Sequence, residues 1–323
     1  MNPKVSVIVP NYKHRQYLHQ RIESILRQTY QNFELIILDD FSSDGSDEII
    51  EEYRSDPHTV AISINTENSG SPFVQWRRGI EMSSGEWIWI AESDDYAEPE
   101  FLEKMIAAAV RYPQAGLIYC DAHIVTNEFV EYETFADVKN RIFRTDRWSH
   151  DHVNAGKNEI ENYLLGESTI NNGSGVLFNA AILKKMNPFD IKLRYIGDKF
   201  AYVKVMAFSD VVYVKDCMNY YRNPFNTKHA GKIIYYVHEQ FKVFDWIWRN
   251  VPDFDRKKFF KAFYSVTDCS FYRKWNYEKV KIFSDLFQTN RFLFLKWAAW
   301  NLVRPFVTRI NRNYRHGHSE IPV

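Results

Sequence analysis

The chain has 323 residues, of which 45% are hydrophobic and 16% aromatic, and its 41 basic side chains balance 41 acidic ones. This composition supports a full hydrophobic core and excludes general disorder, and the balanced charge gives no reason to expect nucleic acid as a partner. Three distant cysteines (Cys120, Cys217 and Cys269) show neither a disulfide framework nor a zinc-ligand spacing, which fits a reducing compartment.

Two features bear on where the protein resides. The first expected strand begins at about Lys4, which leaves no room for a signal peptide. No window holds the roughly 20 apolar residues that a membrane span needs. The most apolar stretch, 292–307, is interrupted by charged residues and a proline. We therefore expect a cytoplasmic protein that does not span a membrane.

The first part of the chain alternates apolar runs with amphipathic stretches, which predicts strands alternating with helices. The expected strands are 5–9, 33–38, 60–64, 87–91 and 116–120. The expected helices are 16–28, one that starts at Asp44 or Ser46 and runs to about 53, 72–84 and 99–112. This spacing is typical of βαβ units and predicts an α/β fold with a doubly wound, mostly parallel sheet flanked by helices.

Beyond residue 122 the pattern is weaker. The stretch 123–143 is consistent with either a flexible excursion or a hairpin, and a helix is expected near 159–165. A glycine-rich loop at 171–175 leads into a strand, and further helices and a strand follow up to about Arg222. From Lys232 the chain becomes rich in aromatic and basic residues with helical spacing, which indicates a separate helical segment.

Acidic side chains follow the second and fourth expected strands: Asp39 and Asp40 after one, and Glu92, Asp94 and Asp95 after the other. Because the carboxyl ends of parallel strands meet at one edge of a sheet, we expect both groups at one site. Crowded carboxylates repel one another, and oxygen ligands suit a hard cation such as Mg²⁺ or Mn²⁺. From these residues alone, a strand that ends in a solvated acidic turn stays an open alternative.

The first strand is not followed by a glycine-rich GxGxxG motif, which argues against a nicotinamide-dependent dehydrogenase. Other segments carry a pattern when taken in order. They are VSVIVPNY at 5–12, SILRQTYQNFELIILDDFSSDGS at 24–46, NSG at 68–70, RRGIEMSSGEWIWIAESDD at 77–95, NNGSGVLF at 171–178 and IGD at 196–198. In this order they resemble the family 2 glycosyltransferases, which are inverting enzymes with a GT-A fold.

The resemblance covers the chain up to the aromatic and basic helices, and it implies a domain organisation. Residues 1–225 would form a GT-A catalytic domain with a Rossmann-like, mostly parallel sheet. Its nucleotide-sugar half would be about 1–122 and its acceptor half about 123–225. Residues 226–323 would form the aromatic and basic helical C-terminal segment.

The resemblance also implies roles for individual residues. Asp198 matches the general base, and Asp94 and Asp95 match the acids that bind a divalent cation. Asp40 matches the acid that accepts hydrogen bonds from the nucleotide base. The remaining candidates for the nucleotide-sugar site are Pro10, Tyr12, Asn68, Arg77 and Glu92, together with Asp94. A turn or helix-cap role for Asp40, and a helix-cap role for Asp198, stay open at this point.

The implied reaction moves a sugar from a nucleotide-diphosphate sugar to an acceptor hydroxyl, with inversion and with Mn²⁺ or Mg²⁺. The implied setting is synthesis of cell-surface polysaccharide or glycolipid, on a saccharide or lipid-linked acceptor. The QxxRW signature of processive members is absent, which favours transfer of one sugar per event. Two alternatives remain: a catalytically silent nucleotide-sugar-binding scaffold, and a nucleotidyltransferase.

The chain departs from the family pattern at two places. Gln75, Trp76 and Arg77 stand where members commonly have an Ala-Arg-Asn run, which leaves the donor contacts of this helix open. Family members often carry a histidine two residues after the segment that corresponds to NYYR at 219–222, and this chain has Pro224 there. His229 either replaces that histidine or is incidental.

An apolar stripe marks the last expected helix, and it consists of Phe292, Leu295, Ala299, Leu302 and Phe306. Packing of this stripe against the catalytic domain is the default expectation. The alternative is a peripheral membrane contact through 256–310 on the cytoplasmic face, with Trp297 and Trp300 at the lipid interface.

Overall fold

The structure is a computed structural model that describes residues 2–126, 129–187, 193–222, 233–267 and 277–301. The chain forms two compact units, Met1–Thr227 and Lys228–Val323. Among the described residues, none of the helices combines the length and apolar character that a membrane crossing requires.

The first unit begins with strands and helices in alternation. In chain order they are β1 (Val5–Asn11), α1 (Arg15–Leu26), β2 (Phe33–Asp39), α2 (Ser46–Glu52), β3 (Thr59–Ile64), α3 (Pro72–Met82), β4 (Trp87–Ile90), β5 (Tyr96–Ala97) and α4 (Phe101–Arg111). Each of these except the short β5 matches an element expected from the sequence. The first strand is expected at 5–9, but β1 continues through Pro10 to Asn11.

The second half of this unit contains longer strands and several short helices. They are β6 (Ala115–Thr126), β7 (Phe129–Thr134), α5 (Phe135–Phe143), η1 (Arg147–Ser149), β8 (His152–Ala155), α6 (Gly156–Glu159), η2 (Ile160–Leu164), η3 (Gly173–Gly175), β9 (Val176–Asn179), α7 (Ala180–Met186), α8 (Gly197–Met206) and β10 (Asp210–Arg222). The open question about 123–143 is therefore answered by a hairpin and a helix. β7 folds back antiparallel onto an extended β6, and a capping box between Thr134 and Asp137 starts α5.

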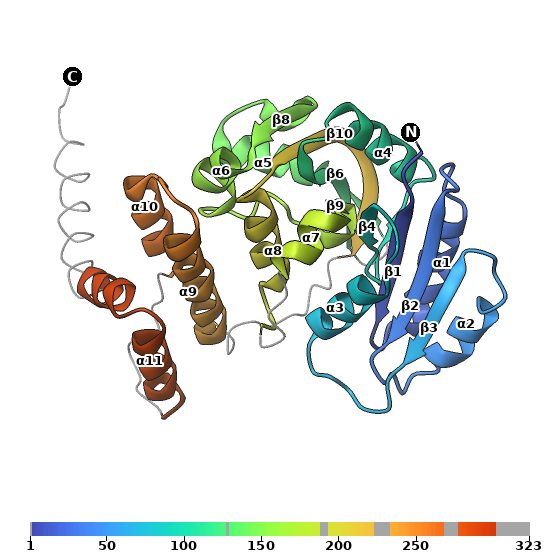
Figure 1. The fold of residues 1–323 in the computed structure, drawn as a ribbon, viewed down its shortest axis with the longest axis horizontal. Helices are drawn as coiled ribbons and strands as arrows, with labels where there is room; N and C mark the ends of the chain where they lie inside the picture. The colour runs from blue at the N-terminus through green and yellow to red at the C-terminus, as the bar shows by residue number, and fades with distance from the viewer. Residues whose placement is uncertain (1, 127–128, 188–192, 223–232, 268–276, 302–323) are drawn as a thin grey trace, which may run out of the picture. The chain divides into compact units, whose positions relative to one another are not determined.

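The strands join in one sheet with the order β3-β2-β1-β4-β9-β6-β10-β5, and β7 and β8 pair with β6 and β10 (Figure 1). The pairs β3–β2, β2–β1 and β1–β4 are parallel. β9 lies antiparallel between β4 and β6. The α/β fold is thus confirmed, with parallel pairs among the first four strands of this order and a further parallel pair between β6 and β10.

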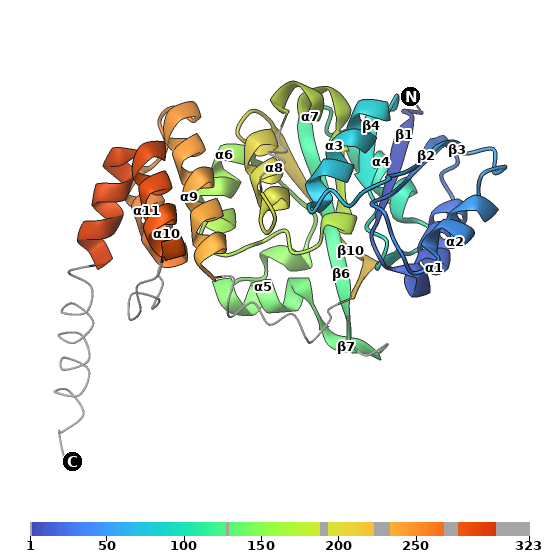
Figure 2. The same ribbon diagram turned by 90° about the horizontal axis from the view of Figure 1, so that it is seen from below.

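Helices cover both faces of the sheet, as Figure 2 shows with α1 and α2 on one side and α3 and α7 on the other. Alternation along β1 explains why both faces are apolar. Val7 packs in the core that includes Ile22 of α1. Ile8 points to the opposite face, where Gly79 of α3 lies so close that a Cβ atom would be 2.4 Å from Ile8 Cγ2. Glycine at this position therefore permits the helix to approach the sheet.

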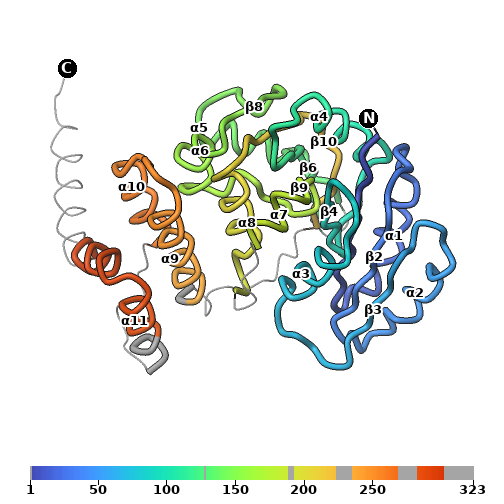
Figure 3. Tube along the Cα trace, viewed as in Figure 1, coloured from blue at the N-terminus to red at the C-terminus, as the bar shows by residue number. Residues whose placement is uncertain are grey.

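The second unit is helical, which confirms the expected helical segment (Figure 3). It contains α9 (Ile233–Asn250), α10 (Arg256–Val266), α11 (Tyr277–Thr289) and a helix at 291–301. Phe241, Phe244, Phe263, Leu293 and Trp297 are buried in it.

The apolar stripe of the last helix is not the side that packs within the second unit, and its expected packing against the catalytic domain stays a prediction. Phe292 and Leu295 are 45% and 60% exposed, and Ala299 is exposed as well. The buried side of this helix carries Leu293 and Trp297 instead. Leu302 and Phe306 lie outside the described residues, as do Pro224 and His229.

A buried carboxylate ties three segments together at the amino-terminal edge of the parallel strands. Glu34 of β2 accepts hydrogen bonds from Ser6 Oγ of β1 at 2.6 Å and from Ser84 N and Oγ at 2.7 Å each. Lys4 Nζ lies 2.5 Å from Glu34 Oε2. Burial raises the pKa of Glu34, but the hydrogen bonds from Lys4, Ser6 and Ser84 outweigh it and hold the pKa at about 2.

We predict that Glu34→Gln lowers the free energy of unfolding by about 1–2 kcal/mol at pH 7, a range that allows for screening at the half-exposed Lys4. Because the pKa is lowered from 4.5 to about 2 on folding, the contribution is complete above pH 4.5 and is lost as the pH falls towards 2. Urea unfolding at pH 7, 4.5 and 3 measures it, with the exposed Glu48→Gln as control. If the free energies of unfolding of wild type and Glu34→Gln differ by the same amount at pH 7 and at pH 3, this assignment is contradicted.

Candidate functional site

A cavity of about 410 Å³ opens at the carboxyl ends of β1 and β4. The register explains its position, because Asn11 at the end of β1 pairs with Asp39 at the end of β2, and Ile8 pairs with Ile90 at the end of β4. The lining residues are Pro10, Asn11, Tyr12, His14, Asn68, Gly70, Ser71, Pro72, Gln75, Trp76, Glu92, Ser93 and Asp94.

Most of the residues that the sequence singled out for a nucleotide sugar lie around this cavity. Pro10, Tyr12, Asn68, Glu92 and Asp94 line it. Another candidate lies elsewhere: the Arg77 side chain is 46% exposed, does not line the cavity, and donates from Nε to Glu81 Oε1 at 2.9 Å.

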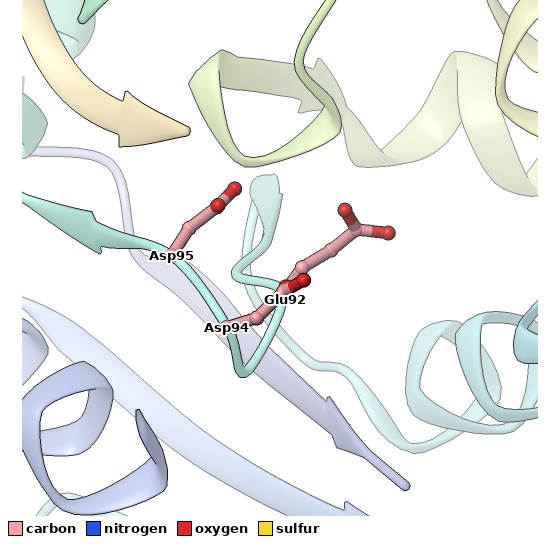
Figure 4. Close-up of side chains that lie close together, drawn as sticks. All are labelled: Glu92, Asp94 and Asp95. Carbon is pink, nitrogen blue, oxygen red and sulfur yellow. The ribbon is translucent and has the colours of Figure 1, made fainter. Parts of the chain in front are cut away.

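Three carboxylates converge beside the cavity. Oxygen atoms of Glu92, Asp94 and Asp95 lie within 4.8 Å of one another, and Figure 4 shows the three side chains leaving a single loop between β4 and β5. Asp95 is buried, whereas Glu92 and Asp94 are partly exposed. The donor set consists of oxygen atoms alone, which suits Mg²⁺ or Mn²⁺ rather than zinc.

The carboxylates raise one another's affinity for protons. Burial raises the pKa of Glu92 well above its usual value, and the charges of Asp94, Asp95 and Asp198 add to this effect. Burial and the charge of Asp94 raise the pKa of Asp95 to about 7, although the charge of Arg21 opposes this. A bound cation would favour the ionised forms of the same groups.

Two arginines hold the acidic loop from outside the cavity. Arg21 of α1 is fully buried, and its Nε donates to the Glu92 carbonyl oxygen at 2.9 Å. At the end of β10, the backbone N–H of Arg222 donates to Asp95 Oδ1 at 3.0 Å, and its Nη1 donates to the Asp94 carbonyl at 2.7 Å. Burial lowers the pKa of Arg21 to about 10 despite the neighbouring acids.

Sequence reasoning missed both arginines. Arg21 carries the one available signal, because it lies on the same face of α1 as Leu18, Ile22 and Ile25, which are all fully buried. A charged residue on a buried helix face requires a polar partner, but the identity of that partner is not local information.

The glycine-rich loop lies against the acidic loop. Because β9 runs antiparallel to β4, the start of β9 meets the carboxyl end of β4. Ser174 therefore accepts a hydrogen bond from Trp89 Nε1 through its carbonyl at 2.7 Å, and its Oγ accepts one from Glu92 N at 3.1 Å. A Cβ on Gly173 would lie 3.2 Å from the Trp76 ring, so this loop also supports the cavity wall.

Asp40 is buried and accepts hydrogen bonds from four residues. Its carboxylate oxygens accept hydrogen bonds from Asn65 Nδ2, Asn68 Nδ2, Ser69 N and Oγ, and Gln75 Nε2 at 2.7–3.2 Å. The neighbouring Asp39 accepts from Asn11 Nδ2 and from Ser42 N, as a turn-forming aspartate does. Both carboxylates thus organise the loops that border the cavity.

Asp198 reaches the same region from the second half of the unit. It lies in the first turn of α8, after Gly197, where a Cβ would be 2.6 Å from the ring of Phe73 in α3. Its charge contributes to the raised pKa values of Glu92 and of the buried Tyr202. The structure therefore gathers the acidic loop, the surroundings of Asp40 and Asp198 at one edge of the sheet.

Known proteins resemble this chain in sequence and in fold. Glycosyltransferase GlyG of Streptococcus pneumoniae serotype 4 is 35% identical over 133 residues, 41% of each chain. The putative teichuronic acid biosynthesis glycosyltransferase TuaG of Bacillus subtilis is 33% identical over 104 residues, 32% of this chain and 41% of that protein. The matches thus span about two fifths of these relatives.

The crystal structure of S. aureus TarS 1–349 in complex with UDP aligns with a TM-score of 0.65, covering 99% of this chain and 94% of the TarS 1–349 chain. At 18% identity this likeness shows the fold alone. The sequence model of Glycosyl transferase family 2 matches residues 6–183, which is more than half of the chain and includes the acidic and glycine-rich loops. The chain therefore belongs to glycosyl transferase family 2.

Proposed function

We propose that this protein transfers a sugar, with inversion, from a nucleotide-diphosphate sugar to an acceptor hydroxyl in the synthesis of a cell-surface polysaccharide or glycolipid. The observation that carries the proposal is the meeting of the cavity, the three-carboxylate loop and Asp198 at one edge of the sheet. The UDP complex of TarS supports the class of donor, and the name of TuaG supports the setting.

Asp94 and Asp95, with Glu92 beside them, are the residues that would hold a divalent cation. Their oxygen atoms lie within 4.8 Å of one another, and the set contains no nitrogen or sulfur ligand. When bound, such a cation neutralises the negative charge that develops on the departing nucleotide diphosphate. Arg21 and Arg222 hold the loop through its carbonyl groups, so the carboxylates remain grouped.

Asp198 is the proposed general base. The acceptor oxygen attacks the anomeric carbon on the face opposite the nucleotide diphosphate, and the bond to the diphosphate breaks. The acceptor proton passes to a carboxylate oxygen of Asp198. One displacement of this kind inverts the anomeric configuration. Asp198 lies in the first turn of α8, so its carboxylate is carried by a helix.

We predict that Asp94→Asn and Asp95→Asn each weaken Mn²⁺ binding by about tenfold or more, because each removes a negative oxygen ligand. Electron paramagnetic resonance of free Mn²⁺ measures the affinity without any need for turnover. Asp216→Asn, a partly exposed acid paired with Lys104, is the control and should bind Mn²⁺ as the wild type does. If Asp94→Asn and Asp95→Asn both bind Mn²⁺ with wild-type affinity, these residues do not hold the cation.

Asp198→Asn should lower the transfer rate by about 10²–10⁴-fold, because the amide cannot accept the acceptor proton. Its affinity for the nucleotide diphosphate in Mn²⁺ should stay within about threefold of wild type. Asp47→Asn, an acid in the first turn of α2, is the matched control. Full activity of Asp198→Asn would exclude it as the base. A wild-type chain that binds nucleotide sugars but never turns over would favour the silent scaffold.

We also propose that the second unit contacts an anionic membrane surface. α10 and the helix at 291–301 carry six basic and no acidic residues: Arg256, Lys257, Lys258, Lys261, Arg291 and Lys296. Aromatic rings link the two helices, since Tyr264 stacks on Trp300 at 4.9 Å and Phe260 contacts Phe292 at 6.3 Å between ring centroids. Aromatic and basic groups together are typical of interfacial helices.

The membrane contact would place Trp300, and not Trp297, at the interface. Trp297 is 2% exposed and donates from Nε1 to the Thr267 carbonyl at 3.2 Å, so it belongs to the core of the unit. Phe292 and Leu295 are exposed beside Lys296, whose Nζ lies 5.7 Å from the Phe292 ring centroid. A lipid-linked acceptor would suit such a contact.

We predict that the full chain co-sediments with vesicles that contain phosphatidylglycerol at low salt and not with pure phosphatidylcholine vesicles. The double variant Lys257→Glu/Lys261→Glu should lower the bound fraction at least about fivefold, because each change reverses one charge. Phe292→Ser/Leu295→Ser should lower it as well. The control is Phe129→Ser, which removes a 76% exposed ring from β7. Binding that ignores lipid charge, or no binding, would overturn the membrane contact.

A further inference from the structure

Two buried amide side chains stand in the wall of the cavity, each held by one of two consecutive carboxylates. Asn11 and Gln75 are 2% and 1% exposed, and both line the cavity. Asn11 Nδ2 donates to Asp39 Oδ1 at 2.7 Å, and Gln75 Nε2 donates to Asp40 Oδ1 at 2.8 Å.

The carboxylates fix the orientation of both amides. An ionised carboxylate only accepts hydrogen bonds, so the NH₂ group must face it and the amide oxygen must face elsewhere. Neither Asn11 Oδ1 nor Gln75 Oε1 has a hydrogen-bond partner within the part of the chain that the structure describes. A buried acceptor without a partner is unfavourable, and a ligand N–H or O–H group would satisfy it.

Asp40 itself has little capacity left for a ligand. A carboxylate offers about four lone-pair sites. Asp40 accepts from Asn65, Asn68, Gln75 and both the backbone N–H and the hydroxyl of Ser69. A nucleobase that bonded to Asp40 would have to displace one of these donors. A nucleobase that bonded to Gln75 Oε1 would displace none.

We propose that Gln75, oriented by Asp40, reads the base of the donor nucleotide by accepting a hydrogen bond from a ring N–H group. This inference rests on the proposed function, in which the donor is a nucleotide-diphosphate sugar. Uracil, thymine and guanine carry a ring N–H on the Watson–Crick edge, whereas cytosine and adenine carry an acceptor nitrogen there. Gln75 Oε1 would face that nitrogen lone pair to lone pair, so CDP-linked and ADP-linked sugars are disfavoured.

The hydrogen bond to Asp40 also explains why Gln75 would select the base through its Oε1 atom alone. Gln75 Nε2 is committed to Asp40, so the amide cannot rotate to offer its NH₂ group to an acceptor base without leaving a buried carboxylate bond unmade. Both amide oxygens are buried, so a base that bonds to Gln75 Oε1 would require a small displacement of the surrounding wall. The cavity volume of about 410 Å³ leaves room for a base and its ribose.

The test measures binding of UDP, dTDP, GDP, CDP and ADP to the full chain by calorimetry in the presence of Mn²⁺. At least one nucleotide with a ring N–H should bind about tenfold more tightly than CDP and ADP. For that nucleotide, methylation of the ring nitrogen should cost the wild type at least the same factor. Gln75→Met should weaken the preferred nucleotide about tenfold and should bind the methylated and unmethylated forms within about twofold of each other.

Gln28→Met is the control, because Gln28 is a 1% exposed glutamine just after α1. Its amide bonds to Leu102 N and to the Glu98 carbonyl, and it does not line the cavity. It should lower stability and leave the order of the five nucleotides unchanged. The methylated nucleotide tests the wild type directly even if Gln75→Met does not fold.

The outcomes separate the inference from the proposed function. If no nucleotide binds, the proposed function fails and the inference fails with it. If nucleotides bind but CDP or ADP equals the best of the others, or if Gln75→Met weakens all five equally, the inference alone is overturned. In that last case Gln75 contacts a group common to all five nucleotides, such as the ribose.

Discussion

The first unit depends on holding three carboxylates together in a partly buried loop. Their mutual repulsion is stronger there than in water, because the surrounding protein screens charge poorly. Two arginines from segments 201 residues apart offset this repulsion: Arg21 of α1 and Arg222 at the end of β10. Both donate to loop carbonyls, so the loop keeps its shape while its acids remain available to a ligand.

That requirement links the loop to the rest of the unit. Arg21 lies over the Trp89 ring at 5.1 Å, within the core that α1 forms with β4. Arg222 lies between Tyr17 of α1 and Tyr96 of β5, and its backbone holds Asp95. Loss of the packing of α1 on β4, or of the pairing of β10 with β5, would therefore displace the arginines that hold the carboxylates. The shape of this loop thus depends on contacts between distant segments.

The direction of β9 has a comparable influence on function. A parallel strand at this position would place the glycine-rich loop at the opposite edge of the sheet. Because β9 is antiparallel, Ser174 bonds to the acidic loop, and the second half of the unit contributes to the same edge as the first. A transferase needs a donor and an acceptor at one point, and this arrangement supplies side chains from both halves there.

The sequence alone predicts most of the strands and helices of the first unit and the position of its acidic loop. Apolar runs such as VSVIV and FELIIL, separated by amphipathic helices, determine the alternating strands and helices through local periodicity. The acidic turn after β4 also follows from sequence, because strand ends in a parallel sheet share an edge. The basic and aromatic character of α10 is a matter of composition alone. None of these features needs a distant partner.

Tertiary structure alone decided the rest. Periodicity shows that a helix face is buried but not what it meets, so the contact of Arg21 with Glu92 could not be read from the chain. The same limit hid the burial of Leu293 and Trp297 within the second unit. Asp40 bonds to residues 25 to 35 positions away, which is why its role as an organiser of Gln75 appears only in the fold. Hydrogen-bond partners across such separations are determined by how helices and strands pack, and the spacing of residues in the sequence does not predict them.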